Sequence, residues 1–364
     1  MLVRKHLKNL KGYKPGKPIS EVKRELGLEQ VIKLASNENP FPPSSRVQKA
    51  ISDSLKEINR YPDANCFLLR RELAKRLKIS PDNLIFGNGS DELIVLAFRA
   101  FVEEDEEIVV GEPSFLIYQS QAEAFKIKVK KSHLKNFRYD LKDMRRLITK
   151  KTKLIFIANP DNPNGTYLSE QEVDDFLKSL PEHVVVFFDE AYAEFAPRDF
   201  PKTLNFLKKG YNIIVTRTFS KAYSLAGLRI GFGVSNKDFI EAMNKVREPF
   251  NVNSLAQIAA VEALKDKSYL KQSLSYIRKE KEFLYSGLQT LKFNFVKSYT
   301  NFILVSTGGT DSKKVFNDLL KRGVIVRDMS GWGLKNYIRV TVGKHNQNNK
   351  FLKELSFICK DIRR

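Results

Sequence analysis

The sequence predicts an α/β fold: a large domain with a mostly parallel sheet covered by helices, and a smaller α+β domain. First, apolar runs of strand length alternate with helical patterns between residues 91 and 221, which is typical of βαβ units. Second, polar residues cluster after the strands, where ligands bind in open α/β sheets. Third, 364 residues suggest roughly two domains. We expect an N-terminal arm and part of the small domain in 1–45, the large domain in 46–265 and the rest of the small domain in 266–364.

Within the large domain, each expected element follows from its pattern of apolar residues. Residues 91–104 and 168–180 have helical spacing, and Ser169 is placed to cap the second helix. Strands are expected at 107–111, 126–135, 153–160, 183–192 and 211–221. Because helices separate most of these strands, we expect right-handed βαβ connections and a sheet that is buried on both faces.

The C-terminal part has a different pattern. Residues 253–288 predict a helical connection between the domains, and 311–323 predict a further helix. The segment "NYIRVTVG" (336–343) predicts a strand. Three of its side chains share one face of that strand: Tyr337, Arg339 and Thr341. This mixture of helices and strands indicates a smaller α+β domain.

The chain is strongly basic, with a net charge of +21 and a pI near 9.7. Nucleic-acid binding is the first alternative that such a charge suggests. However, the lysines are mixed with acids, as in "VKRELGLEQ", and there is no basic arm, zinc-finger spacing or aromatic RNA-binding signature. A lysine-rich solvated surface is the simpler interpretation. We therefore expect no nucleic-acid partner, although the field would favour anionic substrates.

The sequence also indicates the cellular compartment in which the protein is expected. Cys66 and Cys359 have no metal-like or redox-like spacing, which suits free thiols in a reducing compartment. No apolar run approaches the roughly 20 residues of a membrane span, and the basic N-terminus lacks the apolar region of a signal peptide. The four histidines are scattered, so no metal site is expected. A cytoplasmic protein without a membrane partner is the expectation.

One loop combines glycines with a helix start. The segment "FGNGSDELI" (86–94) places Gly89 and Ser90 before a helix whose first turn carries Asp91 and Glu92. Such a turn lets the backbone approach an anion, and a helix N-terminus supplies free N–H groups. The acids suit the same dipole, so a well-capped helix is the simpler interpretation. Neither a P-loop nor a dinucleotide fingerprint fits, because the required Lys-Ser/Thr pair and third glycine are missing.

Three other loops carry polar or aromatic residues, each with an ordinary explanation. The segment "NPDNPNG" (159–165) fixes asparagines beside prolines, as ordinary turns do. In "FFDEAY", Asp189 ends an apolar strand, where a carboxylate is costly unless it meets a cation or a hydrogen-bond donor. A structural ion pair would explain it. In "EPSFLIY", core packing would explain Phe115 and Tyr118.

One lysine differs in context from the many others. Lys221 lies between Ser220 and a run of small residues in "TFSKAYSLAGLRIGFG" (218–233), and Arg229 follows eight positions later. A lysine at a strand end is an imine-forming nucleophile when a desolvated site lowers its pKa. Ser220 and Arg229 both have side chains that bind phosphate.

Together, these loops meet the demands of pyridoxal 5′-phosphate. This cofactor needs an imine-forming lysine and an acid at its ring nitrogen, here Lys221 and Asp189. Asn162 and Tyr192 can donate hydrogen bonds to the phenolate oxygen, and Phe115 can stack on the flat ring. A lysine taken alone would be a solvated surface residue. Five matched elements in the right order reverse that interpretation.

Four segments resemble signature segments of the fold-type I, pyridoxal-phosphate-dependent aminotransferases: "SKAYSLAGLRIGFG", "NPDNPNGT", "FFDEAY" and "GNGSDELI". Residues 15–44, "RYPD" (60–63) and "GVIVRDMS" (323–330) resemble the histidinol-phosphate aminotransferase branch of that family. The resemblance covers nearly the whole chain. It implies transfer of an amino group between histidinol phosphate and 2-oxoglutarate, with imidazole-acetol phosphate and glutamate on the other side, in histidine biosynthesis.

The resemblance also assigns roles to individual residues. It implies that Lys221 carries the cofactor and moves the proton, that Asp189 pairs with the ring nitrogen, and that Tyr192 assists them. It further implies ring contacts from Asn162 and Phe115. The cofactor phosphate would be held by Ser90, Asp91, Ser220 and Arg229.

Residues outside these loops receive expected roles as well. Tyr61, in "RYPD", resembles a tyrosine that reaches the cofactor phosphate of a neighbouring subunit, which implies a homodimer with shared active sites. Arg339 resembles the arginine that binds the substrate anion, and Arg327 is a second candidate. Asn39 is also expected on the substrate side.

Several positions depart from the family pattern, and other functions stay open. Pro42, Trp332, Lys344 and His345 replace residues more usual in the family, and they lie on the expected substrate side. An aromatic amino acid (phenylalanine or tyrosine) transaminase of the same family is therefore the main alternative. A decarboxylase of similar fold is a more distant one, and a cofactor-binding regulator without turnover belongs to a different class. The complete lysine, aspartate and arginine set disfavours the regulator.

Overall fold

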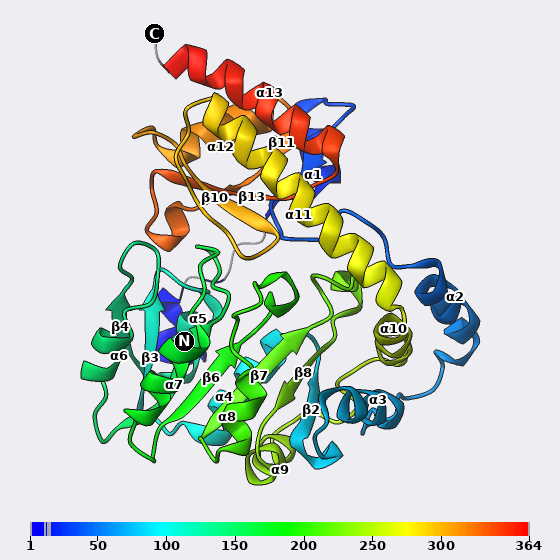
Figure 1. Ribbon diagram of the computed structural model, residues 1–364, viewed down its shortest axis with the longest axis vertical. Helices are drawn as coiled ribbons and strands as arrows, with labels where there is room; N and C mark the ends of the chain where they lie inside the picture. Colours follow the sequence, from blue (N-terminus) through cyan, green and yellow to red (C-terminus); the bar gives the residue numbers. More distant parts are fainter. Residues whose placement is uncertain (1, 11, 13–15, 363–364) are drawn as a thin grey trace.

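The chain folds into two parts in the computed structural model, which describes residues 2–10, 12 and 16–362 (Figure 1). A large domain contains a seven-stranded sheet, and a smaller domain lies against one end of it. Residues 19–33 join the small domain, because β1 (Ile32–Lys33) pairs with β11 (Val324–Ile325), whereas η1 (Lys5–Asn9) packs on helix α5 (Ile117–Phe125) of the large domain. None of the described helices is long and apolar enough to cross a lipid bilayer.

The large sheet has the strand order β2-β8-β7-β6-β5-β3-β4. Its strands are β2 (Leu84–Gly87), β3 (Glu107–Glu112), β4 (Lys128–His133), β5 (Thr152–Ala158), β6 (Val185–Asp189), β7 (Ile213–Thr218) and β8 (Gly231–Val234). Only β8 runs against the others among these strands, since it is antiparallel to both β7 and β2. The expected mostly parallel sheet is confirmed, and the carboxyl ends of its six parallel strands meet at one edge.

Helices cover both faces of this sheet, as expected. On one face, α4 (Ser90–Phe101), α5 (Ile117–Phe125) and α9 (Lys237–Lys245) pack on Phe156 and Phe187. The other face is covered by α6 (Leu141–Arg146), α7 (Glu170–Lys178) and α8 (Thr203–Lys208). These helices pack on a second hydrophobic core, which includes Val186 and Phe188. Residues that alternate along β6 thus enter opposite cores, which explains its continuous apolar run.

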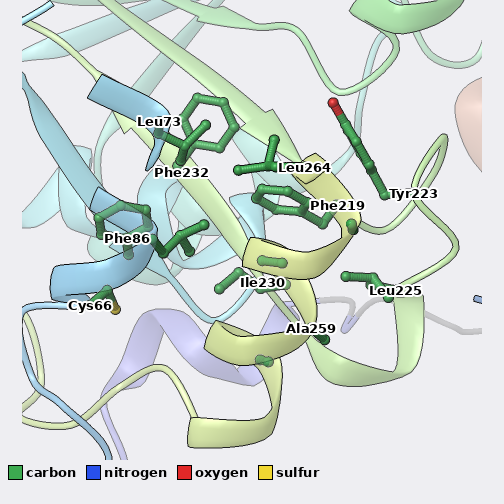
Figure 2. Close-up of a cluster of buried hydrophobic side chains, with 14 of the residues drawn as sticks. Cys66, Leu73, Phe86, Phe219, Tyr223, Leu225, Ile230, Phe232, Ala259 and Leu264 are labelled. Carbon is green, nitrogen blue, oxygen red and sulfur yellow. The ribbon is translucent and has the colours of Figure 1, made fainter. Parts of the chain in front are cut away.

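A third core covers the β2–β8 edge of the sheet (Figure 2). There α2 (Ser45–Ser54), α3 (Phe67–Leu77) and α10 (Ser254–Lys265) pack on residues of the two strands. Figure 2 shows Phe219, Ile230 and Phe232 beside Ala259 and Leu264 of α10. Because Phe219 and Ile230 flank the loop that carries Lys221, this core fixes both ends of that loop.

The small domain contains a four-stranded sheet of order β12-β13-β10-β9. Its strands are β9 (Phe295–Val296), β10 (Phe302–Ser306), β12 (Arg327–Asp328) and β13 (Tyr337–Thr341), and its helices are α1 (Ile19–Leu26), α12 (Ser312–Lys321) and α13 (His345–Ile362). A core that includes Leu319, Val340 and Phe351 fills the space between sheet and helices. These elements confirm the expected α+β arrangement.

The connection between the domains is helical, as expected, and consists of two helices. Residues 253–288 do not form one helix, because α10 ends at Lys265 and α11 (Lys267–Thr290) begins after Asp266. The Asp266 side chain accepts a hydrogen bond from the Tyr269 amide, so it caps α11. The long helix α11 then crosses from α10 to the small domain (Figure 1).

At α7, the expected Ser169 cap is present as a capping box with Glu172.

Candidate active site

A cavity of about 410 Å³ opens at the carboxyl edge of the large sheet, next to the small domain. Its lining includes the residues that directly follow β5, β6 and β7, together with Arg339 of β13. Ten of the residues expected in the site line it: Ser90, Asp91, Phe115, Asn162, Asp189, Tyr192, Ser220, Lys221, Arg229 and Arg339. The fold therefore brings together side chains from six separate segments.

Lys221 is placed at the centre of this lining. Its ammonium group donates to the carbonyl of Ser36 over 3.4 Å and lies 6.0 Å from the centre of the Tyr192 ring. Burial, followed by the nearby charge of Arg339, lowers the pKa of Lys221 from 10.5 to about 8. About a tenth of this amine is thus uncharged at pH 7, whereas an ordinary lysine is almost entirely charged there, and the uncharged amine is the nucleophile.

Asp189 ends β6 inside the site and is 5% exposed. Its carboxylate accepts hydrogen bonds from Tyr118 Oη at 2.9 Å and from the amide of Ala191 at 3.2 Å. In the described part of the chain no cation pairs with it, so the structural ion pair considered above is not present. Burial raises the pKa of Asp189 from 3.8 to about 6. The Asp189 carboxylate therefore has no cationic partner among the described residues, and a bound cation could pair with it.

An anion cradle lies where the N-terminus of α4 meets the loop after β7. Arg229 reaches over Gly89, whose backbone has φ +79°, and its guanidinium lies 3.5 Å from Asp91. A Cβ on Gly231 would lie 2.6 Å from the Ser90 amide nitrogen. Both glycines are therefore required to leave room around the N–H groups and the arginine.

A second cationic region lies on the small-domain side. Arg339 is 5% exposed, donates to the Asn162 side chain and, over 3.0 Å, to the carbonyl of Ala35. Arg327 is its direct partner across β12 and β13. Arg327 does not itself line the cavity, but its guanidinium lies 5.1 Å from the ring centre of Trp332, which does. The guanidinium group of Arg339 thus lines the site, and that of Arg327 lies beside a lining residue.

The structure distinguishes Asn39 from a neighbouring residue that the sequence did not single out. Asn39 is not part of the cavity lining: its amide donates to the carbonyls of Lys221 and Ala222 and to Ser273. Asn37 does line the cavity and donates to Tyr192 Oη over 2.8 Å. Its left-handed backbone, with φ 56°, is a conformation that asparagine tolerates, but the sequence carries no signal that separates Asn37 from Asn39.

Tyr61 lies away from the cavity in this single chain. It is 83% exposed and stacks on Phe250, with ring centres 4.8 Å apart. With Ile58, Pro62 and Leu255 it borders a separate surface hollow. The expected contact of Tyr61 with a cofactor phosphate therefore needs a second subunit.

The comparisons with known proteins agree with this geometry. The pattern of the family described as aminotransferase class I and II matches residues 29–355. Histidinol-phosphate aminotransferase 2 of Carboxydothermus hydrogenoformans is 44% identical over 98% of this chain and 99% of its own. Histidinol-phosphate aminotransferase of Moorella thermoacetica is 43% identical over 97% of this chain and 92% of its own.

The fold of the chain is also similar to that of a solved structure. The crystal structure of histidinol-phosphate aminotransferase from Sinorhizobium meliloti, in complex with pyridoxal 5′-phosphate, superposes with a TM-score of 0.91. It is 27% identical in sequence and covers 99% of this chain and 98% of its own.

Proposed function

The chain belongs to the class I and II aminotransferase family, and from this premise we propose that it transfers an amino group from histidinol phosphate to 2-oxoglutarate. The products are imidazole-acetol phosphate and glutamate, and the step belongs to histidine biosynthesis. The enzyme is an aminotransferase that depends on pyridoxal 5′-phosphate. Its substrates are small molecules.

The residues of the site fit this cofactor. Asp189 is a buried carboxylate without a protein cation among the described residues, which suits a protonated ring nitrogen. Arg229 lines the cavity together with Ser90 and Asp91 at the N-terminus of α4, which suits a phosphate. Lys221, with its lowered pKa, is the candidate for the covalent bond. Phe115, Asn162 and Tyr192 are assigned to the ring.

The chemistry divides between the cofactor and the chain. When bound, pyridoxal 5′-phosphate supplies a carbonyl carbon that takes up the amino group and a ring that disperses the charge left on the substrate carbon. Lys221 would act as the base that removes the Cα proton of the substrate and as the acid that delivers a proton to the aldehyde-derived carbon of the cofactor. Asp189 keeps a proton on the ring nitrogen. The burial of these groups at the sheet edge limits the access of water.

The two arginines carry the substrate assignment. Arg339 lines the cavity and Arg327 is its direct partner on the neighbouring strand, which supports the binding of a phosphate or carboxylate group. Histidinol phosphate carries no carboxylate, so its phosphate would take the place that the carboxylates of glutamate and 2-oxoglutarate occupy in the other half-reaction. One cationic site then serves both half-reactions.

A second candidate, an aromatic amino acid transaminase, draws on a different observation. Phe115, Ile117 and Trp332 give the cavity an apolar side that would also accept the ring of phenylalanine or tyrosine. Such a substrate still presents a carboxylate to Arg339. The two candidates differ in their need for Arg327, because a dianionic phosphate gains more from a second cation than a carboxylate does.

We further propose that the working unit is a homodimer with shared active sites. Ile58, Tyr61 and Phe250 form an exposed apolar cluster, with 60%, 83% and 43% exposure. Such clusters on a protein surface mark interaction sites. A second copy seated here would bury the cluster, and Tyr61 would then extend toward the phosphate of the neighbouring site.

The function is tested with the purified protein and added pyridoxal 5′-phosphate. Glutamate formation from 2-oxoglutarate is measured with histidinol phosphate, phenylalanine and tyrosine as competing donors. A higher kcat/KM for histidinol phosphate supports the proposal. A higher kcat/KM for phenylalanine assigns the aromatic transaminase instead. Release of carbon dioxide from phenylalanine or tyrosine in the absence of 2-oxoglutarate would indicate a decarboxylase.

A further inference from the structure

Helix α11 contains a lysine that is almost fully buried and lies outside the cavity lining. Lys281 is 8% exposed, and its ammonium group donates to the carbonyls of Ser298 at 2.7 Å and Thr300 at 3.0 Å. No carboxylate in the described part of the chain pairs with it. A buried, unpaired lysine is costly, so its place calls for an explanation. Burial lowers its pKa to about 8.

The segment that Lys281 holds, residues 298–301, is a loop that leads into β10. Ser298 and Thr300 also bond to each other through their hydroxyls at 2.8 Å, and Tyr285, one turn along α11, accepts from the Ser298 amide. Ser298, Thr300 and Asn301 are all buried. We call residues 298–301 the junction loop, because it touches both domains.

On one side, the junction loop contacts the turn that carries Asn162. The amide of Tyr299 donates to the carbonyl of Gly165 over 2.7 Å. A Cβ on Gly165 would lie 2.5 Å from Ser298 Oγ, so the two backbones are in close contact. The turn is closed by hydrogen bonds between Asp161 and Thr166 and between Gly165 and Asp161, and it contains Asn162.

On the other side, the junction loop reaches Tyr192 through one intermediate residue. The Asn301 side chain donates to the carbonyl of Asn37 over 2.9 Å. The Asn37 side chain donates to Tyr192 Oη over 2.8 Å. The two residues assigned to the phenolate oxygen of the cofactor, Asn162 and Tyr192, are therefore both linked to the loop that Lys281 holds.

We propose that Lys281 is a positioning residue that, through the junction loop, sets Asn162 and Tyr192 against the ring of the cofactor. The part of this inference that concerns the ring rests on the proposed function. The part that concerns the turn at 161–166 does not. An ammonium group suits the task because it donates to two carbonyls at once from one point, whereas a methionine of similar length donates to neither.

The test compares three variants. Lys281→Met removes the donors, Lys281→Arg keeps them, and Lys279→Met changes an exposed lysine of the same helix. Hydrogen exchange of the amides at 161–166 is measured first, without cofactor or substrate. We expect Lys281→Met to speed that exchange about tenfold, as for the loss of one buried hydrogen bond, and the other two variants to leave it unchanged. The same exchange rate in all variants would overturn the proposal.

The second readout is the pH titration of the absorbance of the bound cofactor. Donors to the phenolate oxygen stabilise its negative charge, so their loosening should move the titration midpoint to higher pH. We expect this shift, and a lower kcat with little change in KM, in Lys281→Met alone. A lower melting temperature without any midpoint shift would show a purely structural role and would refute the proposal. If Lys281→Met does not fold, Lys281→Leu, which also lacks a donor, replaces it with the same expectations.

These outcomes are separate from the fate of the proposed function. If the unmodified protein does not accept histidinol phosphate but the exchange and titration change as expected, the substrate assignment fails and the role of Lys281 stands. If it accepts histidinol phosphate and Lys281→Met leaves both readouts unchanged, the substrate assignment stands and the role of Lys281 is lost.

Discussion

Arg327 and Arg339 lie directly opposite each other on the antiparallel strands β12 and β13, so both side chains leave the same face of the small sheet. Like charges in such a pair destabilise the sheet. Each guanidinium is partly compensated by an aromatic ring 5.1 Å away, Trp332 under Arg327 and Phe302 under Arg339. An anionic substrate group between the arginines would remove the remaining repulsion.

This pair gives the first prediction, which concerns Arg327→Met. We expect kcat/KM for histidinol phosphate to fall by roughly 10- to 150-fold, the value of a charge-assisted contact of about 1.5–3 kcal/mol, and the value for phenylalanine to fall much less. Lys335→Met, which removes an exposed charge nearby, is the control. An equal loss for both donors would favour the aromatic transaminase.

The second prediction concerns the influence of Arg339 on Lys221. Its positive charge is one cause of the lowered pKa of Lys221, so Arg339→Met should raise that pKa above about 8. The pH dependence of covalent attachment of pyridoxal 5′-phosphate, trapped with borohydride, measures the pKa of Lys221.

Lys221→Ala should lose the trapped adduct and nearly all turnover. Normal activity in Lys221→Ala would contradict the whole mechanism.

The third prediction concerns pH and Asp189. Its folded-state pKa of about 6 lies above the ordinary 3.8, so its contribution to stability is complete below about pH 4 and is lost as pH rises through 6. Asp189→Asn cannot ionise. Without cofactor, this variant should therefore be more stable than the unmodified protein at pH 7.5, by roughly 1–3 kcal/mol, and not at pH 4.

Chemical unfolding at both pH values measures this difference. Addition of pyridoxal 5′-phosphate should stabilise the unmodified protein more than Asp189→Asn, because only a carboxylate attracts the protonated ring nitrogen. Turnover should fall by orders of magnitude in the variant. A stability difference that is independent of pH would mean that burial does not raise the pKa of Asp189.

The fourth prediction concerns the exposed apolar cluster around Tyr61. Ile58→Glu places a charge in it and should convert the dimer to monomers with weak cofactor binding, as sedimentation and absorbance would report. Tyr61→Phe should keep the proposed dimer. It should weaken the free energy of cofactor binding by about 0.5–1.5 kcal/mol, the value of one hydrogen bond, and so raise the dissociation constant. Leu26→Glu, at an exposed site on α1, is the control. An active monomer would defeat the shared site.

The fifth prediction concerns Gly89. A methyl group there would lie 2.5 Å from Nη2 of Arg229, and the backbone φ of +79° disfavours any side chain. Gly89→Ala should displace Arg229 and raise the dissociation constant for pyridoxal 5′-phosphate at least tenfold, the loss of about one charge-assisted contact. Fluorescence titration measures it. If the affinity is unchanged, the phosphate does not bind in this cradle.

Much of the fold could be predicted because its signals are local. The strands that became β3, β5, β6 and β7 are continuous apolar runs, which two-sided burial requires. The reversed direction of β8 could not be predicted in this way. Its four residues, Gly231–Val234, carry no mark of direction, and their pairing with β2 joins segments far apart in the chain.

The site was predictable where a motif specifies backbone geometry, and not where the contacts are long-range. Lys221 and Asp189 follow strand ends, so their meeting at one edge follows from the topology. The bond from Tyr118 to Asp189 spans 71 positions, and the one from Asn37 to Tyr192 spans 155. Nothing local distinguishes Asn37 from Asn39, although one lines the cavity and the other does not.

The antiparallel course of β8 gives the loop between β7 and β8 fixed ends. Thr218 pairs with Gly231, and the Phe219 amide donates to the Ile230 carbonyl over 3.1 Å. Ordering a free segment costs about 1–2 kcal/mol per residue, and here sheet pairing and core packing meet that cost before any cofactor arrives. The affinity of the cofactor is therefore not reduced by an ordering penalty for this loop. As a result, the enzyme should release its cofactor and take it up again repeatedly without refolding this part of the site.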